Sequence, residues 1–211
     1  MSRRSYNPDI VKKENITAGI KPLNSSTEIR TSLRIPLNRG IASCILMNPS
    51  AADKDNSDET INFVTEYIYG NFPDIQRIRF FNLYPFYEGE SSKIYKLMDN
   101  LTPLEYSESM KANRKAIKGT LSTTTHLFLG YGQCSGNKDD KIKYYNPETT
   151  EILEMIKDFY SKKIFVFETT QNEKILIKGK YPRHPNPNNE HKAINHHECF
   201  IDENGSIKLM D

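Results

Sequence analysis

The segment from Ile41 to Thr60 changes abruptly from an apolar run into a polar loop. Its first seven residues are apolar or small, and they lie between Gly40 and the Asn48-Pro49 pair. Such a run is typical of a strand buried on both faces, because a half-exposed strand alternates apolar and polar residues. Pro49 cannot donate to a strand ladder, so the strand ends there. The polar residues that follow predict a loop at the carboxyl edge of an open α/β sheet, where ligands bind.

Length, charge and cysteine content favour a single cytoplasmic domain. The chain has 211 residues, which suits one core, and its net charge of +2 provides no strong field to attract nucleic acid or anionic membrane. Its three cysteines (Cys44, Cys134 and Cys199) are too few and too widely spaced for a disulfide framework or a four-cysteine metal set. No segment approaches the roughly 20 apolar residues of a membrane span, and no secretory signal follows the N-terminus. We therefore expect a soluble cytoplasmic protein.

The chain divides into a polar N-terminal segment and a longer patterned region. Residues 1–30 show little periodicity and are expected to form an irregular N-terminal arm before a single α/β domain over residues 31–211. Residues 28–37 alternate apolar and polar side chains, which indicates an edge strand or hairpin. Residues 136–147 are expected to form a polar loop, and residues 191–200 a helix or turn.

Three further apolar runs predict buried strands, and helical patterns separate them. The second strand begins at Gln76 and ends in Asn82, and the third and fourth cover residues 125–132 and 163–168. The expected helices follow a cap at Ser57 or Asp58, fill residues 91–119 with a break near Pro103, and cover residues 148–160. Alternating strands and helices require crossover connections, so the sequence predicts a mainly parallel sheet. Neither a P-loop nor a dinucleotide fingerprint is present in the sequence.

Four short segments, taken in chain order, resemble the uracil-DNA glycosylase superfamily. They are Leu46-Met-Asn48-Pro49-Ser50, Phe80-Phe-Asn82-Leu-Tyr-Pro85, Phe128-Leu-Gly130-Tyr-Gly132 and Arg183-His184-Pro185-Asn186-Pro187. The run Met-Asn-Pro-Ser-Ala-Ala-Asp with a later Asp-Glu-Thr also resembles a bacterial and phage family, domain of unknown function 1643. The superfamily resemblance covers roughly residues 40–190. It implies a three-layer α/β/α fold with a central, mainly parallel four-stranded sheet.

The resemblance assigns chemistry to two of these segments. Asn48 matches the residue that orients the attacking water, and His184 matches the histidine that stabilises negative charge on the leaving base. An amide positions water but cannot take its proton, which implies slow hydrolysis or a general base among Asp53, Asp55 and Asp58. The competing interpretation of Asn48 is a loop residue that satisfies backbone groups.

The same resemblance implies a base pocket and a DNA-binding surface. Asn82 matches the amide that reads a pyrimidine edge, with a structural cap as the alternative. Three aromatic residues, Phe63, Tyr67 and Phe81, are candidates to stack on a flipped base, although each also suits core packing. The expected DNA contacts are Gly130, Lys180, Arg183 and Asn186.

Two departures from the superfamily bear on the substrate. Ser50 stands where the uracil-specific branch has a tyrosine that crowds pyrimidine C5, so the resemblance implies a pocket open to 5-substituted bases. Residues 187–189 stand where many members carry a leucine wedge, which implies another wedge or a single-stranded substrate.

The leading hypothesis is a monofunctional DNA glycosylase that removes a modified pyrimidine and leaves an abasic site. Phage DNA supplies such bases, including glucosylated hydroxymethylcytosine, so a role in anti-phage defence follows by analogy. The alternatives are a non-catalytic nucleic-acid-binding module and an N-glycosidase of free nucleosides or nucleotides. A metal site from His191, His196, His197 and Cys199 is a weaker idea than ordinary packing. The expected partner is duplex or single-stranded DNA, with no membrane, cofactor, metal or obligate protein partner.

Overall fold

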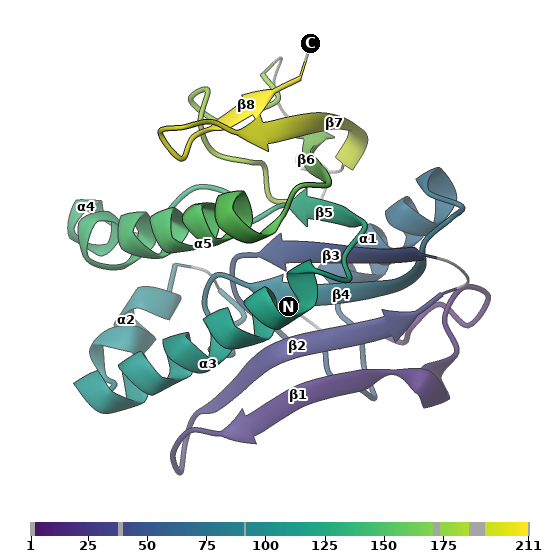
Figure 1. The fold of residues 1–211 in the computed structure, drawn as a ribbon. Helices are drawn as coiled ribbons and strands as arrows, with labels where there is room; N and C mark the ends of the chain where they lie inside the picture. Colours follow the sequence, from purple (N-terminus) through teal and green to yellow (C-terminus); the bar gives the residue numbers. More distant parts are fainter. Residues whose placement is uncertain (1–2, 38–39, 91, 171–173, 186–192, 211) are drawn as a thin grey trace.

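The computed structural model describes residues 3–37, 40–90, 92–170, 174–185 and 193–210. These residues build a sheet of eight strands in the order β1-β2-β4-β3-β5-β6-β7-β8 (Figure 1). The strands are β1 Thr17–Pro22, β2 Glu28–Pro36, β3 Gly40–Leu46, β4 Gln76–Asn82, β5 His126–Leu129, β6 Lys163–Thr169, β7 Ala193–Ile201 and β8 Ile207–Leu209.

The sheet is mixed and is larger than the four strands expected from the sequence. The four predicted strands are its centre, where β4, β3, β5 and β6 pair in parallel. Antiparallel pairs flank them, since β1 and β2 extend the sheet beyond β4, and β7 and β8 extend it beyond β6. The expectation of a mainly parallel sheet is therefore wrong for the whole sheet, because four of its seven pairings are antiparallel.

The added strands come from segments that the sequence assigned to other structures. Residues 17–22 belong to the expected irregular arm, and the arm also buries Tyr6, Val11 and Ile16 against the core. Residues 193–200 were expected to be helix or turn, but they lie in β7. Antiparallel strands near an edge keep one face in water, so their polar side chains conceal them from a search for apolar runs.

The helices mostly follow the sequence prediction. They are η1 Lys13–Asn15, α1 Glu59–Asn71, α2 Ile94–Asp99, α3 Pro103–Leu121, α4 Lys138–Asp140, the π-helix η2 Lys141–Tyr145 and α5 Asn146–Phe159. The predicted cap of α1 is confirmed, because the Asp58 carboxylate accepts the Ile61 N–H at 2.9 Å. The break before Pro103 is also confirmed, and Thr102 caps α3. The loop expected over residues 136–147 is wrong, because Asn137 caps α4 and the chain continues as helix.

Helices lie on both faces of the sheet. In β3, Ile45 faces one core, whereas its neighbours Cys44 and Leu46 face the other. The core on the Cys44 side contains apolar side chains of α1, and the core on the Ile45 side contains those of α3 and α5. Figure 1 shows α3 and α5 in front of the sheet and α1 behind it. The helix that connects β3 to β4 thus packs on one face of the sheet, and the helices that connect β4 to β5 and β5 to β6 pack on the other.

The described part of the chain has no helix long and apolar enough to cross a membrane. Its three cysteines are all free, as expected from their spacing, and Cys44 and Cys199 are buried.

Candidate functional site

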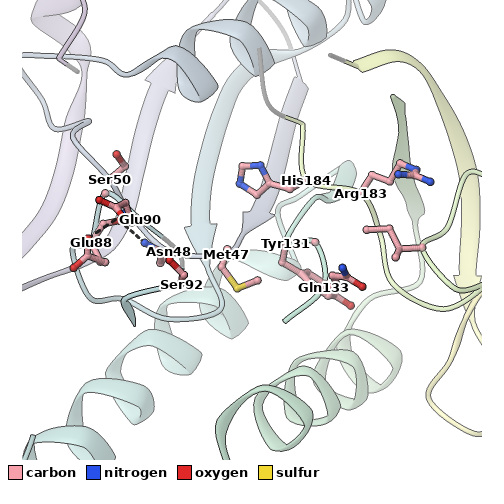
Figure 2. A pocket seen from close by; sticks show the side chains of 13 residues that line it. Met47, Asn48, Ser50, Glu88, Glu90, Ser92, Tyr131, Gln133, Arg183 and His184 are labelled. Carbon is pink, nitrogen blue, oxygen red and sulfur yellow. Dashed lines mark hydrogen bonds between the residues drawn. The ribbon is translucent and has the colours of Figure 1, made fainter. Parts of the chain in front are cut away.

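A cavity of about 490 Å³ opens at the carboxyl ends of β3 and β5 (Figure 2). Its volume falls within the range of about 300–1,000 Å³ that is typical of small-molecule sites. After β3 the chain adds β4 on one side of that strand, and β5 then pairs on the other side. Open α/β sheets bind ligands where the order of strands reverses in this way, outside the carboxyl ends of the strands. We call this cavity the cleft.

Asn48 lies on one wall of the cleft with its amide held in a fixed orientation. Its Nδ2 donates to the backbone oxygens of Glu88, at 2.6 Å, and Pro49, at 3.2 Å. A carbonyl oxygen only accepts hydrogen bonds, so these contacts identify the nitrogen side of the amide. The Oδ1 atom accepts no hydrogen bond from the residues that the structure describes. Asn48 therefore lies at the cleft, as expected, and also forms hydrogen bonds with loop backbone groups, which was the competing interpretation.

Glu88 is the acidic residue beside Asn48, and the sequence analysis missed it. Its side chain is half-buried and lines the cleft, and its Oε1 accepts the Glu90 N–H at 3.0 Å. The Glu88 N–H donates to the Pro49 oxygen at 3.0 Å, so the loops after β3 and β4 are joined on both sides of Asn48. Its position in the sequence could have indicated this role. Glu88 lies in the loop after β4, and the carboxyl ends of the parallel strands β3 and β4 lie at the same edge of the sheet.

The three aspartates expected to supply a base lie outside the cleft. Asp53 Oδ1 accepts the N–H groups of Asp55 and Asn56, each at 2.7 Å, and so shapes its own loop. Asp55 is exposed, with Lys54 3.7 Å away. Asp58 is buried as the cap of α1. The contacts of Asp53 and Asp58 give these two residues structural roles in the loop and the helix cap.

His184 lines the opposite wall of the cleft. In Figure 2 its ring points across the cavity toward the side that carries Ser50, Asn48 and Glu88. Two glycines after β5 allow this approach. A Cβ added to Gly130 would lie 2.9 Å from Pro185 Cδ, and one added to Gly132, where φ is +73°, would lie 3.2 Å from His184 Cβ. Gly130 thus packs against the His-Pro segment, which differs from the expected contact with DNA.

Asn82 does not face the cleft, although its sequence context resembles that of Asn48. It is 1% exposed, its Oδ1 accepts from Arg30 Nη2 at 3.1 Å, and its backbone oxygen accepts from Asn113 Nδ2 at 2.8 Å. Arg30 also donates to the Ala52 oxygen at 2.6 Å. These contacts of Asn82 fit a structural role, which was the alternative to reading a pyrimidine edge.

The aromatic candidates also belong to the cores. Phe81 is 1% exposed in the core beneath α3 and α5. Phe63 is partly buried against the core of α1, with its ring 6.4 Å from that of Tyr67. The aromatic residue that lines the cleft is Tyr131, and burial raises its pKa far above the usual value, so its phenol stays protonated. The amide of Gln133 follows it at the cleft and is exposed.

The remaining described residues expected to contact DNA lie in different parts of the structure. Arg183 lines the cleft but is 6% exposed, and its Nε donates to the Lys174 oxygen at 2.9 Å. Its guanidinium points away from His184 in Figure 2, so it supports the loop that carries the histidine. Lys180 is exposed and lines a second cavity. Asn186 lies outside the described residues.

The histidines near the C-terminus make separate contacts. His196 Nδ1 lies 3.0 Å from the Tyr67 hydroxyl, whereas His197 Nε2 lies 2.8 Å from Glu168 Oε2. Within the described ranges, no group of three or more His, Cys, Asp or Glu side chains could hold a metal ion. His191, the fourth member of the suggested metal set, is not among the described residues.

Comparison with known proteins identifies a family and no further relative. The family model described as a protein of unknown function (DUF1643) matches residues 32–186. No curated protein and no solved structure matches the chain. The match covers most of the chain and includes the cleft, so the chain belongs to the DUF1643 family, as the Asn48-Pro49 segment suggested.

Proposed function

We propose that this member of the DUF1643 family is a DNA glycosylase that hydrolyses the N-glycosidic bond of a modified pyrimidine. The observation that carries the proposal is the composition of the cleft. Asn48 and Glu88 lie on one wall and His184 on the other, at the strand-order reversal where open sheets bind ligands. Three of the four segments that resemble uracil-DNA glycosylases line this cavity, since Tyr131 and Gly132 of the third join the residues of the first and the fourth.

The central layer of the fold is consistent with this resemblance. The four parallel strands β4, β3, β5 and β6 carry the resembling segments at or beyond their carboxyl ends, and helices cover both faces. We infer a three-layer α/β/α core of the uracil-DNA glycosylase type, with the β1–β2 and β7–β8 hairpins as additions at its edges.

The proposed reaction assigns one step to each side chain. Asn48 Oδ1 accepts a hydrogen bond from a water molecule, and the Glu88 carboxylate takes a proton from that water as its oxygen bonds to C1′ of the sugar. The bond from C1′ to the base nitrogen breaks, and its electron pair passes to the pyrimidine. His184 donates a hydrogen bond to the base, where negative charge develops. The departing base takes a proton from solvent and Glu88 returns its proton to solvent, so the products are the free base and an abasic sugar.

Glu88 supplies the general base that the Asn48 amide cannot provide. An amide cannot accept the proton of water, but a carboxylate at the next loop can, and it also stabilises positive charge on the sugar in the transition state. The two residues act from one rigid wall, because hydrogen bonds join Asn48, Pro49 and Glu88.

The size of the cleft and the residue at Ser50 suggest the substrate class. Ser50 lines the cleft with a small side chain, and the cavity of about 490 Å³ leaves room for a substituent on pyrimidine C5. We therefore propose a 5-substituted pyrimidine, such as glucosylated hydroxymethylcytosine, and a role against phage DNA. Gln133 replaces Asn82 as the proposed reader of the base edge, because its amide lines the cleft and offers both a donor and an acceptor.

A second candidate is the hydrolysis of a free nucleoside. Glu88 and Glu90 both line this wall of the cleft, and since Lys93 pairs with Glu90 at 2.7 Å, the Glu88 carboxylate is the charge that repels the phosphates of a polynucleotide. A nucleoside without phosphate avoids this repulsion. Its test is the release of free base from nucleosides and not from oligonucleotides.

Labelled oligonucleotides that carry uracil, thymine, hydroxymethylcytosine or its glucosylated form test the proposal. Each is incubated with protein in single- and double-stranded form and then treated with alkali, which cuts the strand at an abasic site. We expect cutting at a 5-substituted pyrimidine, its loss in Glu88→Gln, and its retention in Asp55→Asn, whose carboxylate lies outside the cleft. If no strand is cut and no nucleoside is hydrolysed, the enzyme proposal fails and a non-catalytic binding module takes its place.

A further inference from the structure

Two lysines that are distant in the sequence meet at the ring of Tyr181. Lys141 Nζ and Lys180 Nζ each lie 5.1 Å from the centroid of that ring. Neither forms an ion pair within the described residues, whereas nearby Lys143 has Asp99 as its partner at 2.6 Å. Both ammonium groups therefore keep their charge available to an anion that approaches this ring.

The backbone presents both lysines on unusual local structures. Lys178 and Gly179 have φ values of 53° and 69°, and the Lys180 N–H donates to the Ile177 oxygen at 3.1 Å, which makes a two-residue turn. A lysine rarely adopts the left-handed region, and such a conformation persists where the surroundings require it. Lys141 begins the π-helix η2, a rare conformation found frequently at functional sites.

A polar cavity of about 300 Å³ lies beside Lys180, and Lys141 reaches its edge through the Tyr181 ring. Lys180 and Tyr181 line it, together with the neutral side chains of Asn146, Thr150 and Ser206. Hydroxyl and amide groups donate hydrogen bonds to phosphate oxygens, and the ammonium supplies the opposite charge. No Asp or Glu side chain is among the described residues that line this cavity. Its chemistry therefore suits an anion with several acceptor oxygens.

This cavity and the cleft share structural support. Tyr131 lines both of them. The Tyr145 hydroxyl donates to the backbone oxygen of Gly132 at the cleft, and the Tyr145 ring meets that of Tyr181 edge-on, with centroids 5.6 Å apart. The lysine pair thus lies beside the His184 wall, away from the wall that carries Glu88 and Glu90. A strand that enters the cleft would meet Lys141 and Lys180 on the side of the His184 wall.

We propose that Lys141, Lys180 and the polar cavity bind a backbone phosphate of a nucleic-acid strand whose neighbouring nucleotide occupies the cleft. The occupant of the cleft rests on the proposed function, but phosphate binding at the lysine pair does not. The site gives a protein of low net charge a local means of holding DNA, and it directs the strand toward one side of the cleft.

Fluorescence anisotropy with a labelled single-stranded oligonucleotide of unmodified bases tests the site over a series of salt concentrations. Each phosphate contact on a single strand contributes about 0.7 to the slope of log affinity against log salt. Because the site binds one phosphate, we expect the Lys141→Ala/Lys180→Ala variant to lower the slope by about 0.7 and the affinity at low salt by about tenfold. The control is Lys118→Ala, since Lys118 Nζ also lies over a ring, 3.7 Å from the Phe159 centroid, near the other end of α5.

The outcome separates this site from the enzyme proposal, because the oligonucleotide carries no reactive base. An unchanged slope in the double variant, or an equal loss in Lys118→Ala, overturns the phosphate site even if the protein cuts modified DNA. A lowered slope in a protein that hydrolyses no substrate supports the site and leaves a binding module. Thermal melting of each variant excludes loss of fold as the cause.

Discussion

Asn48 and Asn82 end two neighbouring parallel strands in similar sequence contexts, yet they lie in different environments. Asn48 is two residues beyond the end of β3 and lines the cleft, whereas Asn82 is the last residue of β4 and is 1% exposed. The buried residues Asn82, Arg30 and Ala52 and the partly buried Tyr87 form a group that we call the Arg30 cluster. A polar residue at the carboxyl edge of a sheet thus supports a loop or meets a ligand, according to how far beyond the strand it lies.

The Arg30 cluster holds the loop that the cleft uses. Arg30 Nη1 and Nη2 bridge Ala52 and Asn82, and the Tyr87 hydroxyl donates to the Ala52 oxygen at 3.3 Å. Burial lowers the pKa of Arg30, while the phenol of Tyr87 and the carboxylate of Asp58 act in the opposite direction. A cation enclosed in this way contributes through its hydrogen bonds, so removing it should affect stability, whereas changes in the cleft should affect chemistry.

The largest expected effect is on catalysis. Glu88→Gln and His184→Ala each remove a group that acts on charge formed in the transition state, so we expect base excision to fall by about 10²–10³-fold. Because both residues lie at a cavity, the free energy of unfolding should change by less than about 0.5 kcal/mol. Single-turnover cutting of a modified oligonucleotide and urea unfolding measure the two quantities. A loss of activity that is accompanied by a large decrease in the free energy of unfolding would contradict the distinction between a catalytic cleft and a stabilising Arg30 cluster.

The next effect is on stability. Arg30→Met leaves Asn82 Oδ1 buried without its donor and the Ala52 oxygen with the Tyr87 hydroxyl as its remaining donor, so we expect unfolding to require about 2–4 kcal/mol less. Arg34→Met is the matched control, because Arg34 is exposed on the same strand and should change stability by less than about 0.5 kcal/mol. Urea unfolding of both variants measures the difference. A stable Arg30→Met protein would show that the cluster does not support the loop.

A smaller effect is expected on substrate choice. Ser50→Tyr places a ring at the cleft where a C5 substituent is proposed to lie, so the ratio of activities should shift by at least about tenfold toward uracil. Competition between a glucosylated hydroxymethylcytosine oligonucleotide and a uracil oligonucleotide measures this ratio. Ser50→Ala is the control, because it adds no bulk. If Ser50→Tyr leaves this ratio of activities unchanged, Ser50 does not correspond to the tyrosine of the uracil-specific branch.

The smallest expected effect is the pH dependence of stability, and it arises outside both regions. Burial lowers the pKa of His126 and His196 below the usual 6.5. In the unfolded chain both bind protons near pH 6.5, so stability should be complete above that pH and fall as the pH drops toward the lower folded values. The His126→Phe/His196→Phe variant should unfold with a weaker dependence between pH 7.5 and 5.5. The Ser50→Ala variant, which changes no titratable group, should keep the wild-type dependence, and a weaker dependence in that variant would link the cleft to folding.

Part of this architecture was predictable from local pattern. Long apolar runs identified the four central strands, and helical spacing with a short acidic cap identified α1. The resemblance of short segments predicted that Asn48 and His184 share one site, and both residues line the cleft.

The remaining features depend on tertiary contacts that leave little trace in the sequence. The outer strands carry polar side chains on a solvated face, so β1 and β7 lack an apolar run. Arg30 is the only arginine of β2 that is buried, yet nothing in its neighbours distinguishes it from Arg34. Glu88 gains its position from hydrogen bonds to another loop, which chain order alone does not predict.

The most direct test of the central claim is mass-spectrometric detection of free base released from DNA that contains a 5-substituted pyrimidine. We expect the wild-type protein to release the intact modified base, Asp55→Asn to release it at a similar rate, and His184→Ala to release about 10²-fold less. Release that is unaffected by His184→Ala, or no release from DNA or nucleosides, would contradict the assignment of this cleft as an N-glycosidase site.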